Sequence, residues 1–185
     1  ESRRIFDSMA AATSTAGVDK AGARRRQANE PKSWAKPAFA EATGCTVEVP
    51  VNDAGEPMVL EPVLTVEAAA TYIVGTETRP SPWAGRKFRV KVMLDTDYPF
   101  KGPGTGDIVF IDRPYHPNVM DTGALCCQGL EWKPVKGLKD IAKFVRESIS
   151  QPNAEHFVNP EAAKMMDDNL AAFELRARTG DKRSA

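Results

Sequence analysis

The pattern of apolar and polar residues changes from a strand period to a helix period along the chain. From Phe88 to Leu94 every second residue is a large apolar one, and this period of two predicts a strand over 87–94 with one buried face. Shorter strand-like segments are predicted within 45–75 and over 107–112, separated by turn residues. The intervening loops are too short for crossover helices, so the strands are expected to form a four-stranded antiparallel meander.

The second half of the chain has the spacing of helices. One apolar stripe follows Gly137 at i, i+3, i+4 and i+7 intervals and predicts a helix; its members are Leu138, Ile141, Ala142, Val145 and Ile149. A second helix is predicted to begin with Asn159 as N-cap and Pro160 at its first position, with one stripe formed by Ala162, Met166, Leu170 and Phe173. Strands followed by helices predict an α+β domain, with helices packed on one sheet.

The 185 residues are enough for one ordinary domain. We divide the chain into an N-terminal extension over 1–44, a core domain over 45–180 and a short tail over 181–185. Within the extension, segments 3–12 and 19–29 are compatible with helices. Its three consecutive arginines, at 24–26, are interpreted as a solvated helix face.

Charge and cysteine content narrow the class of protein. The 25 basic and 25 acidic side chains cancel, which gives no overall attraction to nucleic acid or to an acidic membrane. No apolar run approaches the roughly 20 residues that a membrane helix needs, so a soluble protein is expected. Its three cysteines do not form the even, spaced set of a secreted disulfide framework, which favours the cytoplasm or nucleus.

Cys126 and Cys127 are the first candidates for chemistry. Their loop-like surroundings favour a reactive thiol, although a cysteine is often only a small apolar residue, and both interpretations stay open at this point. Zinc is disfavoured because adjacent cysteines with one nearby histidine lack the ligand spacing of a zinc site. A cysteine hydrolase would need His116 or His156 as base, but no local protease signature surrounds either cysteine, and His116 before Pro117 is equally suited to holding a turn.

Several motifs follow one another in the order seen in ubiquitin-conjugating enzymes. They are "TYIVG", "PWAGRKFRVKVML", "DYPFKGP", "YHPN", "GALC", "EWKP", "QPN" and "PEAA". Cys126 follows His116 by ten residues, the spacing of that family's active-site cysteine. From about 45 to 178 the chain therefore resembles the ubiquitin-conjugating enzyme family, and the ordered set is far more specific than any one motif. The resemblance implies the ubiquitin-conjugating (UBC) fold, with an N-terminal helix and C-terminal helices flanking the sheet.

The resemblance also implies roles for the residues of the motif. Cys126 would accept the C-terminus of ubiquitin or a ubiquitin-like modifier as a thioester from an activating enzyme. A lysine of a protein substrate, or a ligase cysteine, would then attack that thioester. Asn118 would either donate to the oxyanion of the transition state or hold the loop in shape. His116 and Pro117 would be structural, and no metal or other cofactor is implied.

The chain departs from the family's pattern around the cysteine. Gln128 stands where Asp or Asn is common and His156 where Asp is common, and we expect both to line the active site in a structural role. Although His156 cannot act as a carboxylate, it could accept a proton near neutral pH. Cys127 replaces an aliphatic residue, and the loop from Cys126 to Trp132 is shorter than usual. We expect these changes to affect the efficiency of transfer to a lysine more than the formation of the thioester.

The resemblance implies two partner-binding loops as well. Phe100, Trp132, Pro134 and Val135 match the positions that meet RING or HECT ligases and, in overlapping fashion, the activating enzyme. An exposed aromatic beside prolines suits an anchoring contact, and the alternative is that Trp132 only packs in the core. Gly102 stands where the family has proline, and "GTGD" lengthens the loop after it.

Two further expectations concern the branch of the family and an alternative function. The segment 132–163 aligns without gaps to the conjugating enzyme of the neddylation pathway, so that branch is a candidate. The altered positions near Cys126 leave a second function open, in which the fold is a binding or structural module with weakened chemistry. The Cys126 and Asn118 pair argues against that module.

Overall fold

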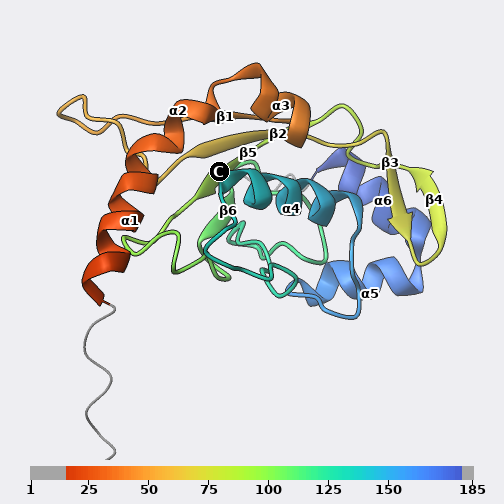
Figure 1. Cartoon of the computed structure of the whole chain (residues 1–185). Coiled ribbons are helices and arrows are strands. Elements are labelled where there is room, and N and C mark those ends of the chain that lie inside the picture. The colour runs from red at the N-terminus through yellow and green to blue at the C-terminus, as the bar shows by residue number, and fades with distance from the viewer. Residues whose placement is uncertain (1–15, 181–185) are drawn as a thin grey trace, which may run out of the picture.

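The computed structural model describes residues 16–180. Its elements follow along the chain as α1 (Ala16–Asn29), α2 (Pro31–Trp34), α3 (Pro37–Thr43), β1 (Cys45–Glu48), β2 (Val63–Glu67), β3 (Thr71–Val74), β4 (Glu77–Pro80), β5 (Lys87–Val92), β6 (Ile108–Phe110), α4 (Leu138–Ser150), α5 (Pro160–Asp168) and α6 (Leu170–Thr179). Figure 1 shows α1 at one end of the molecule and the β3–β4 hairpin with α5 and α6 at the other. Within this described part, no helix is both long and apolar enough to cross a membrane.

Four strands form one antiparallel sheet in the order β1-β2-β5-β6. The α+β class and the four-stranded antiparallel sheet expected from the sequence are therefore confirmed. The β3–β4 hairpin is a separate two-stranded unit that lies between β2 and β5 in the sequence. The strand predicted over 87–94 ends at Val92. Alternate residues of β2 and β5 are buried, as a half-covered sheet requires.

α4 covers the inner face of this sheet (Figure 1). Every member of the apolar stripe predicted for it is buried, from Leu138 to Ile149. The stripe packs on the sheet residues Leu64, Val66, Phe88 and Val90 within one core. Because this stripe faces the sheet, the opposite side of α4 is free to form part of a surface site.

The last predicted helix is interrupted. Its start is confirmed, because the Asn159 side chain accepts a hydrogen bond from the Ala162 N–H at 3.1 Å and Pro160 follows at the first position. The prediction of one continuous helix with a single apolar stripe was wrong. The chain leaves helical geometry at Asn169, where φ is −154° and ψ is 83°. The Asn169 side chain caps α6 by accepting from the Ala172 N–H at 3.0 Å. An asparagine that caps the next helix competes with continuation of the previous one.

Among the described residues before β1, three helices follow one another, namely α1 and the shorter α2 and α3. The segment predicted as helical over 19–29 lies in α1, whereas 3–12 falls outside the described residues. Trp34 and Phe39 are buried in the same core as the sheet. The domain boundary at residue 44 stays a prediction.

The interpretation of the arginines at 24–26 as a solvated helix face is correct for two of the three. Arg24 and Arg25 are exposed, as a solvated helix face requires. Arg26 is partly buried and forms an ion pair with Glu30 at 2.8 Å. Its other partners are backbone carbonyls more than a hundred residues away, which no local pattern could indicate.

The N-cap of α5 provides a first test of the fold. Replacing Asn159 by Ala removes the acceptor for the Ala162 N–H, and we expect the free energy of unfolding to fall by about 1 kcal/mol. Asn159→Asp retains a capping oxygen and should stay close to the wild type. Urea denaturation of the three proteins measures the difference, and equal losses for both variants would contradict the cap.

Candidate active site

The His-Pro-Asn turn is buried and holds its own shape. His116 is 0% exposed, and its Nδ1 accepts the backbone N–H of Asn118 at 3.0 Å. Its ring packs on Trp83 with the ring centroids 4.9 Å apart. Burial lowers the pKa of His116 to about 3, an effect only partly opposed by the carbonyl of Ile149. The imidazole is therefore neutral and enclosed, and it cannot serve as a base in an open site.

The Asn118 side chain joins this turn to the loop before α5. Its Nδ2 donates to the carbonyls of Asn153 and His156, each at 2.8 Å, and its Oδ1 accepts the Asn153 N–H at 2.7 Å. Both N–H groups of the amide are therefore occupied. Of the two roles considered for Asn118, this geometry favours holding the loop, because donation to an oxyanion would first require one of these bonds to break.

Cys126 lies directly beside this turn. Its backbone N–H donates to the Asn118 carbonyl at 2.9 Å, and its side chain is half-buried. The residue opens onto a groove with a volume of about 440 Å³. The groove is lined by Asn118, Cys126, Gln128, Gly129, Phe144, Glu147, Ser148, Gln151, Asn153 and His156. The structure thus brings together four residues that the sequence nominated for the site, namely Cys126, Asn118, Gln128 and His156.

Cys127 is turned into a different environment. Its Sγ donates to the Gly104 carbonyl at 3.3 Å, and its backbone N–H donates to Thr105 Oγ1 at 3.2 Å. Burial raises the pKa of Cys127 to about 12, with smaller contributions from Cys126 and Asp107. The unusual second cysteine therefore contacts the lengthened "GTGD" loop directly.

Sequence reasoning missed Glu147 as a groove residue. It is the single carboxylate among the residues described as lining the groove. Three of the lining residues, Phe144, Glu147 and Ser148, lie on α4 away from its buried stripe, and Gln151, the C-cap of α4, continues their i, i+3, i+4, i+7 spacing. That spacing was visible in the sequence, but nothing local indicated that this exposed face borders Cys126.

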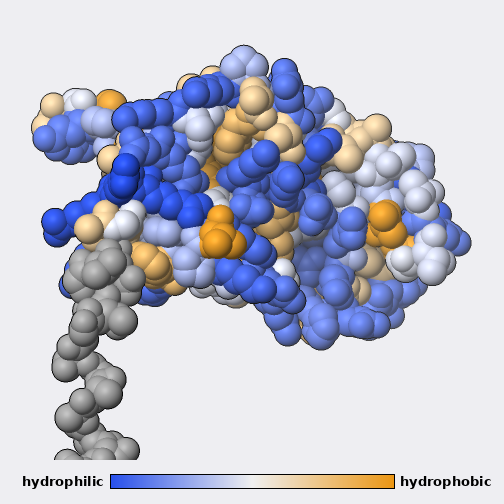
Figure 2. All heavy atoms as spheres, in the orientation of Figure 1, coloured by the Kyte–Doolittle hydropathy of each residue, from blue (hydrophilic) through white to orange (hydrophobic). Residues whose placement is uncertain are grey.

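The two loops expected to bind partners differ in how their side chains are held. Phe100 is 45% exposed and Val135 is 84% exposed, with Pro134 exposed beside it. Trp132 is half-buried, and its Nε1 donates to the Pro99 carbonyl at 2.7 Å. Trp132 therefore braces one loop against the other while keeping part of its ring at the surface. The face drawn in Figure 2 is mainly hydrophilic, with separate small apolar patches.

Within residues 16–180, no cluster of three or more His, Cys, Asp and Glu side chains is arranged to hold a metal ion. The polar side chains of the groove are amides, one hydroxyl, one imidazole and one carboxylate beside a thiol. Such a set suits acyl transfer through the cysteine, because a thiolate is both a nucleophile and a leaving group.

Comparison with known proteins agrees with this fold and site. A family model described as ubiquitin-conjugating enzyme matches residues 61–180, which is 120 of 185 residues. The solved E2 domain of a Toxoplasma gondii ubiquitin conjugating enzyme is similar in fold, with a TM-score of 0.65 and 22% identity over 84% of this chain and 95% of that one. The domain is thus a UBC fold with a cysteine in an open groove. The chain belongs to the ubiquitin-conjugating enzyme family.

Curated relatives share part of their length with this chain. Ubiquitin-conjugating enzyme E2 S of Drosophila melanogaster is 35% identical over 120 residues, or 63% of this chain and 56% of the relative. E2 S-B of Xenopus laevis is 32% identical over 100 residues, which is 53% of this chain and 46% of the relative. The chain spans about half the length of these relatives. Both are named for ubiquitin, and the neddylation branch stays a prediction.

Gly102 explains one departure from the family's pattern. A Cβ atom at this position would lie 2.2 Å from Cγ of Trp132, so the indole ring needs a glycine beneath it. We expect Gly102→Ala to displace the ring and to lower the free energy of unfolding by about 1–3 kcal/mol. The matched control is Gly104→Ala, whose added methyl group meets only Asp107 Oδ2 at 3.8 Å. Denaturation followed by tryptophan fluorescence measures both, and equal stability of the two variants would contradict this packing.

Thiol labelling tests the different surroundings of the cysteines. Because the pKa of Cys127 is raised from 9.0 to about 12, its thiol stays protonated near pH 9, where an ordinary cysteine is half ionised. In the folded protein we expect iodoacetamide to modify Cys126 first, while Cys127 and the buried Cys45 react slowly. Peptide mass spectrometry locates the label, and unfolded protein is the control in which all three react. Labelling of Cys127 as fast as Cys126 would show that the contact with Gly104 is wrong.

Proposed function

We propose that this protein accepts ubiquitin or a ubiquitin-like modifier as a thioester on Cys126. The observation that carries the proposal is the cysteine itself, which opens onto a groove beside the His-Pro-Asn turn in a member of this family. The Cys126 thiolate attacks the thioester carbonyl on an activating enzyme, and the activating enzyme's cysteine leaves as thiolate. One thioester is exchanged for another, so this step needs no cofactor or oxidant.

In the second step a lysine amine of a protein substrate, or a ligase cysteine, attacks the carbonyl on Cys126. An amine forms an amide, loses a proton and releases the Cys126 thiolate. His156 is the imidazole that lines the groove, and we assign it the role of accepting that proton. Glu147 supplies the groove's negative charge, which favours the approach of a cationic lysine.

Asn118 has a supporting part in this proposal. Its three hydrogen bonds keep the 153–156 loop, and with it His156, against the Cys126 turn. The groove therefore keeps its shape before the modifier arrives. Preorganisation of this kind lowers the cost of reaching a transition state, because fewer groups must be reordered.

The proposed contact surface for the activating enzyme and, in overlapping fashion, for a RING or HECT ligase consists of Phe100, Trp132, Pro134 and Val135. The exposed fractions of Phe100 and Val135 and the bracing of Trp132 support this surface. Apolar side chains held in place are suited to anchoring a partner at small entropic cost. The cytoplasm or nucleus is the proposed location, where thiols stay reduced.

The charging reaction is the direct test. The protein is incubated with ATP, an activating enzyme and its matching modifier, using ubiquitin first and the neddylation-type modifier second. We expect an adduct that disappears on addition of a thiol reductant. Cys126→Ser should give no thiol-sensitive adduct and at most a more stable ester, whereas the matched Cys127→Ser should still be charged. Failure of the wild type with every modifier tried would sink the proposal.

A second candidate is a binding module with weakened chemistry. The observation in its favour is the composition of the groove, where Gln128 and His156 replace smaller or acidic residues expected from the family's pattern and Glu147 is the single carboxylate among the described lining residues. A module of this kind would bind a partner without forming the thioester. The same charging experiment separates the two functions, and subsequent addition of free lysine measures whether the thioester is passed on.

A further inference from the structure

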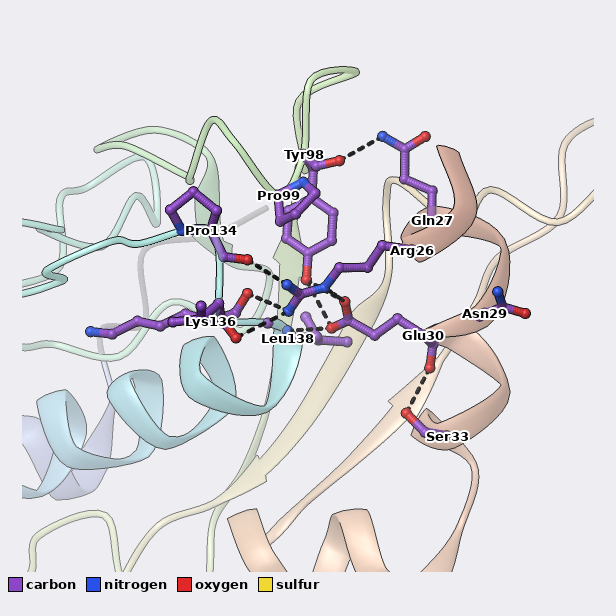
Figure 3. Close-up of polar contacts among 12 residues, drawn as sticks. Arg26, Gln27, Asn29, Glu30, Ser33, Tyr98, Pro99, Pro134, Lys136 and Leu138 are labelled. Atoms are coloured by element: carbon purple, nitrogen blue, oxygen red, sulfur yellow. Dashed lines mark hydrogen bonds and ion pairs between the residues drawn. The ribbon is translucent and has the colours of Figure 1, made fainter. Parts of the chain in front are cut away.

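The side chain of Arg26 reaches from α1 to the loop before α4 (Figure 3). Its guanidinium donates to the backbone carbonyls of Pro134 and Lys136 and approaches that of Val135 at 3.5 Å. Its Nε donates to Glu30 at 2.8 Å. The planar fork of one guanidinium thus faces neighbouring carbonyls of the loop on one side and a carboxylate on the other.

Glu30 holds Arg26 and the start of α4 together. Only 14% of its side chain is exposed, and its carboxylate accepts the Tyr98 hydroxyl and the Leu138 N–H, each at 2.8 Å. Leu138 is the first residue of α4, so the negative charge lies where the helix dipole favours it. A Cβ atom on Gly137 would lie 2.5 Å from Glu30 Oε1, and glycine is what permits this approach.

The same stretch of α1 also holds a second loop. Gln27 Nε2 donates to the carbonyls of Thr96 and Tyr98, at 2.8 and 2.9 Å. Trp132 Nε1 donates to the Pro99 carbonyl at 2.7 Å and so joins the second loop to the first. Neighbouring residues of one helix therefore fix two segments that are far apart in the sequence.

Residues 95–101 and 132–137, here called the paired loops, carry the exposed side chains of Phe100 and Val135. Arg26 binds backbone atoms, so it fixes where the chain runs and leaves these two side chains facing solvent. The separation of Phe100 from Val135 then depends on contacts behind the surface. A partner that touches both side chains is sensitive to that separation.

We propose that Arg26 is a positioning residue for partner docking, because it sets the paired loops in the arrangement that a partner meets. The inference rests on the proposed function, since it takes the paired loops as the surface used by the activating enzyme and by ligases. Arg26 touches neither the modifier nor Cys126 in this scheme. Its effect is on the binding of partners and leaves the chemistry at the sulfur unchanged.

An arginine is needed for this role, and a lysine cannot replace it. A lysine ammonium has the same charge but is a single point, and it cannot span Glu30 and two loop carbonyls with the fixed geometry of a guanidinium. Arg26→Lys therefore removes the positioning while keeping the charge of α1. The matched control is Arg25→Lys, the same change at the neighbouring exposed position.

The experiment measures the paired loops and the charging reaction on the same proteins. Hydrogen exchange by NMR should be faster in Arg26→Lys at the amides of Lys136 and Phe100, one in each loop, while amides of the sheet keep the wild-type rate. With ATP, ubiquitin and the activating enzyme, the KM for this protein should rise roughly tenfold while kcat stays constant. Arg25→Lys should match the wild type in both measurements. Glu30→Gln, which removes the charge that holds Arg26, should repeat the Arg26→Lys result.

Each other result overturns the proposal. Unchanged exchange in the paired loops would show that Arg26 does not position them. Faster exchange with an unchanged KM would show that their position does not affect docking. A uniform increase in exchange over the whole domain would mean that Arg26 only stabilises the fold. A wild type that is never charged would contradict the proposed function instead, whereas the exchange data would still decide whether Arg26 orders the loops.

Discussion

The active-site groove depends on the three hydrogen bonds of the Asn118 amide. These bonds connect a turn at residues 115–118 with a loop at 153–156, and Cys126 is attached to the same turn through the Asn118 carbonyl. A buried amide that satisfies the backbone groups of a second segment leaves that segment little freedom to move, because every broken bond exposes an unpaired polar group. The shape of the groove is therefore set largely by the bonds of one side chain, Asn118, to the backbone of the 153–156 loop.

The regular part of this structure could be predicted from the sequence. The stripe of α4 follows from helical spacing alone, and the N-cap of α5 follows from the Asn159-Pro160 pair. The resemblance to the family, through the ten residues between His116 and Cys126, selected Cys126 as the candidate, and the structure places this cysteine on the groove. Each of these signals is local, and the packing of the core agrees with the local preference.

The rest could not be predicted because it depends on contacts between distant segments. Arg26 was assigned to a solvated face, and its partners are backbone carbonyls, which have no signature in the sequence. The break at Asn169 could not be predicted because an asparagine can lie inside a helix or cap the start of one. Which of the two occurs depends on the packing around it. Glu147 was visible as an exposed helix position, but which exposed face borders Cys126 is a property of the topology.

The departures of this chain from its family occur as coupled pairs. Cys127 contacts the lengthened loop through Gly104 and Thr105, and Gly102 provides the space that Trp132 fills. In the first case an unusual cysteine contacts an unusual loop, and in the second an unusual glycine makes room for a tryptophan that belongs to the family's motif. Substituting one member alone would leave either an unfilled space or a steric clash, so each pair is expected to behave as a unit in which the effects of mutations are not additive.

The proposed chemistry and the proposed docking surface rest on separate supports. Asn118 organises the groove around Cys126, whereas Arg26 and Glu30 organise the paired loops from α1. The two supports meet at α4, whose first residue is held by Glu30 and whose outer face forms one wall of the groove. The buried stripe of α4 packs in the core on the sheet, so the helix is fixed independently of either support. Loss of one support is therefore expected to leave the other in place, which is why a change at Arg26 should leave the chemistry at Cys126 unaltered.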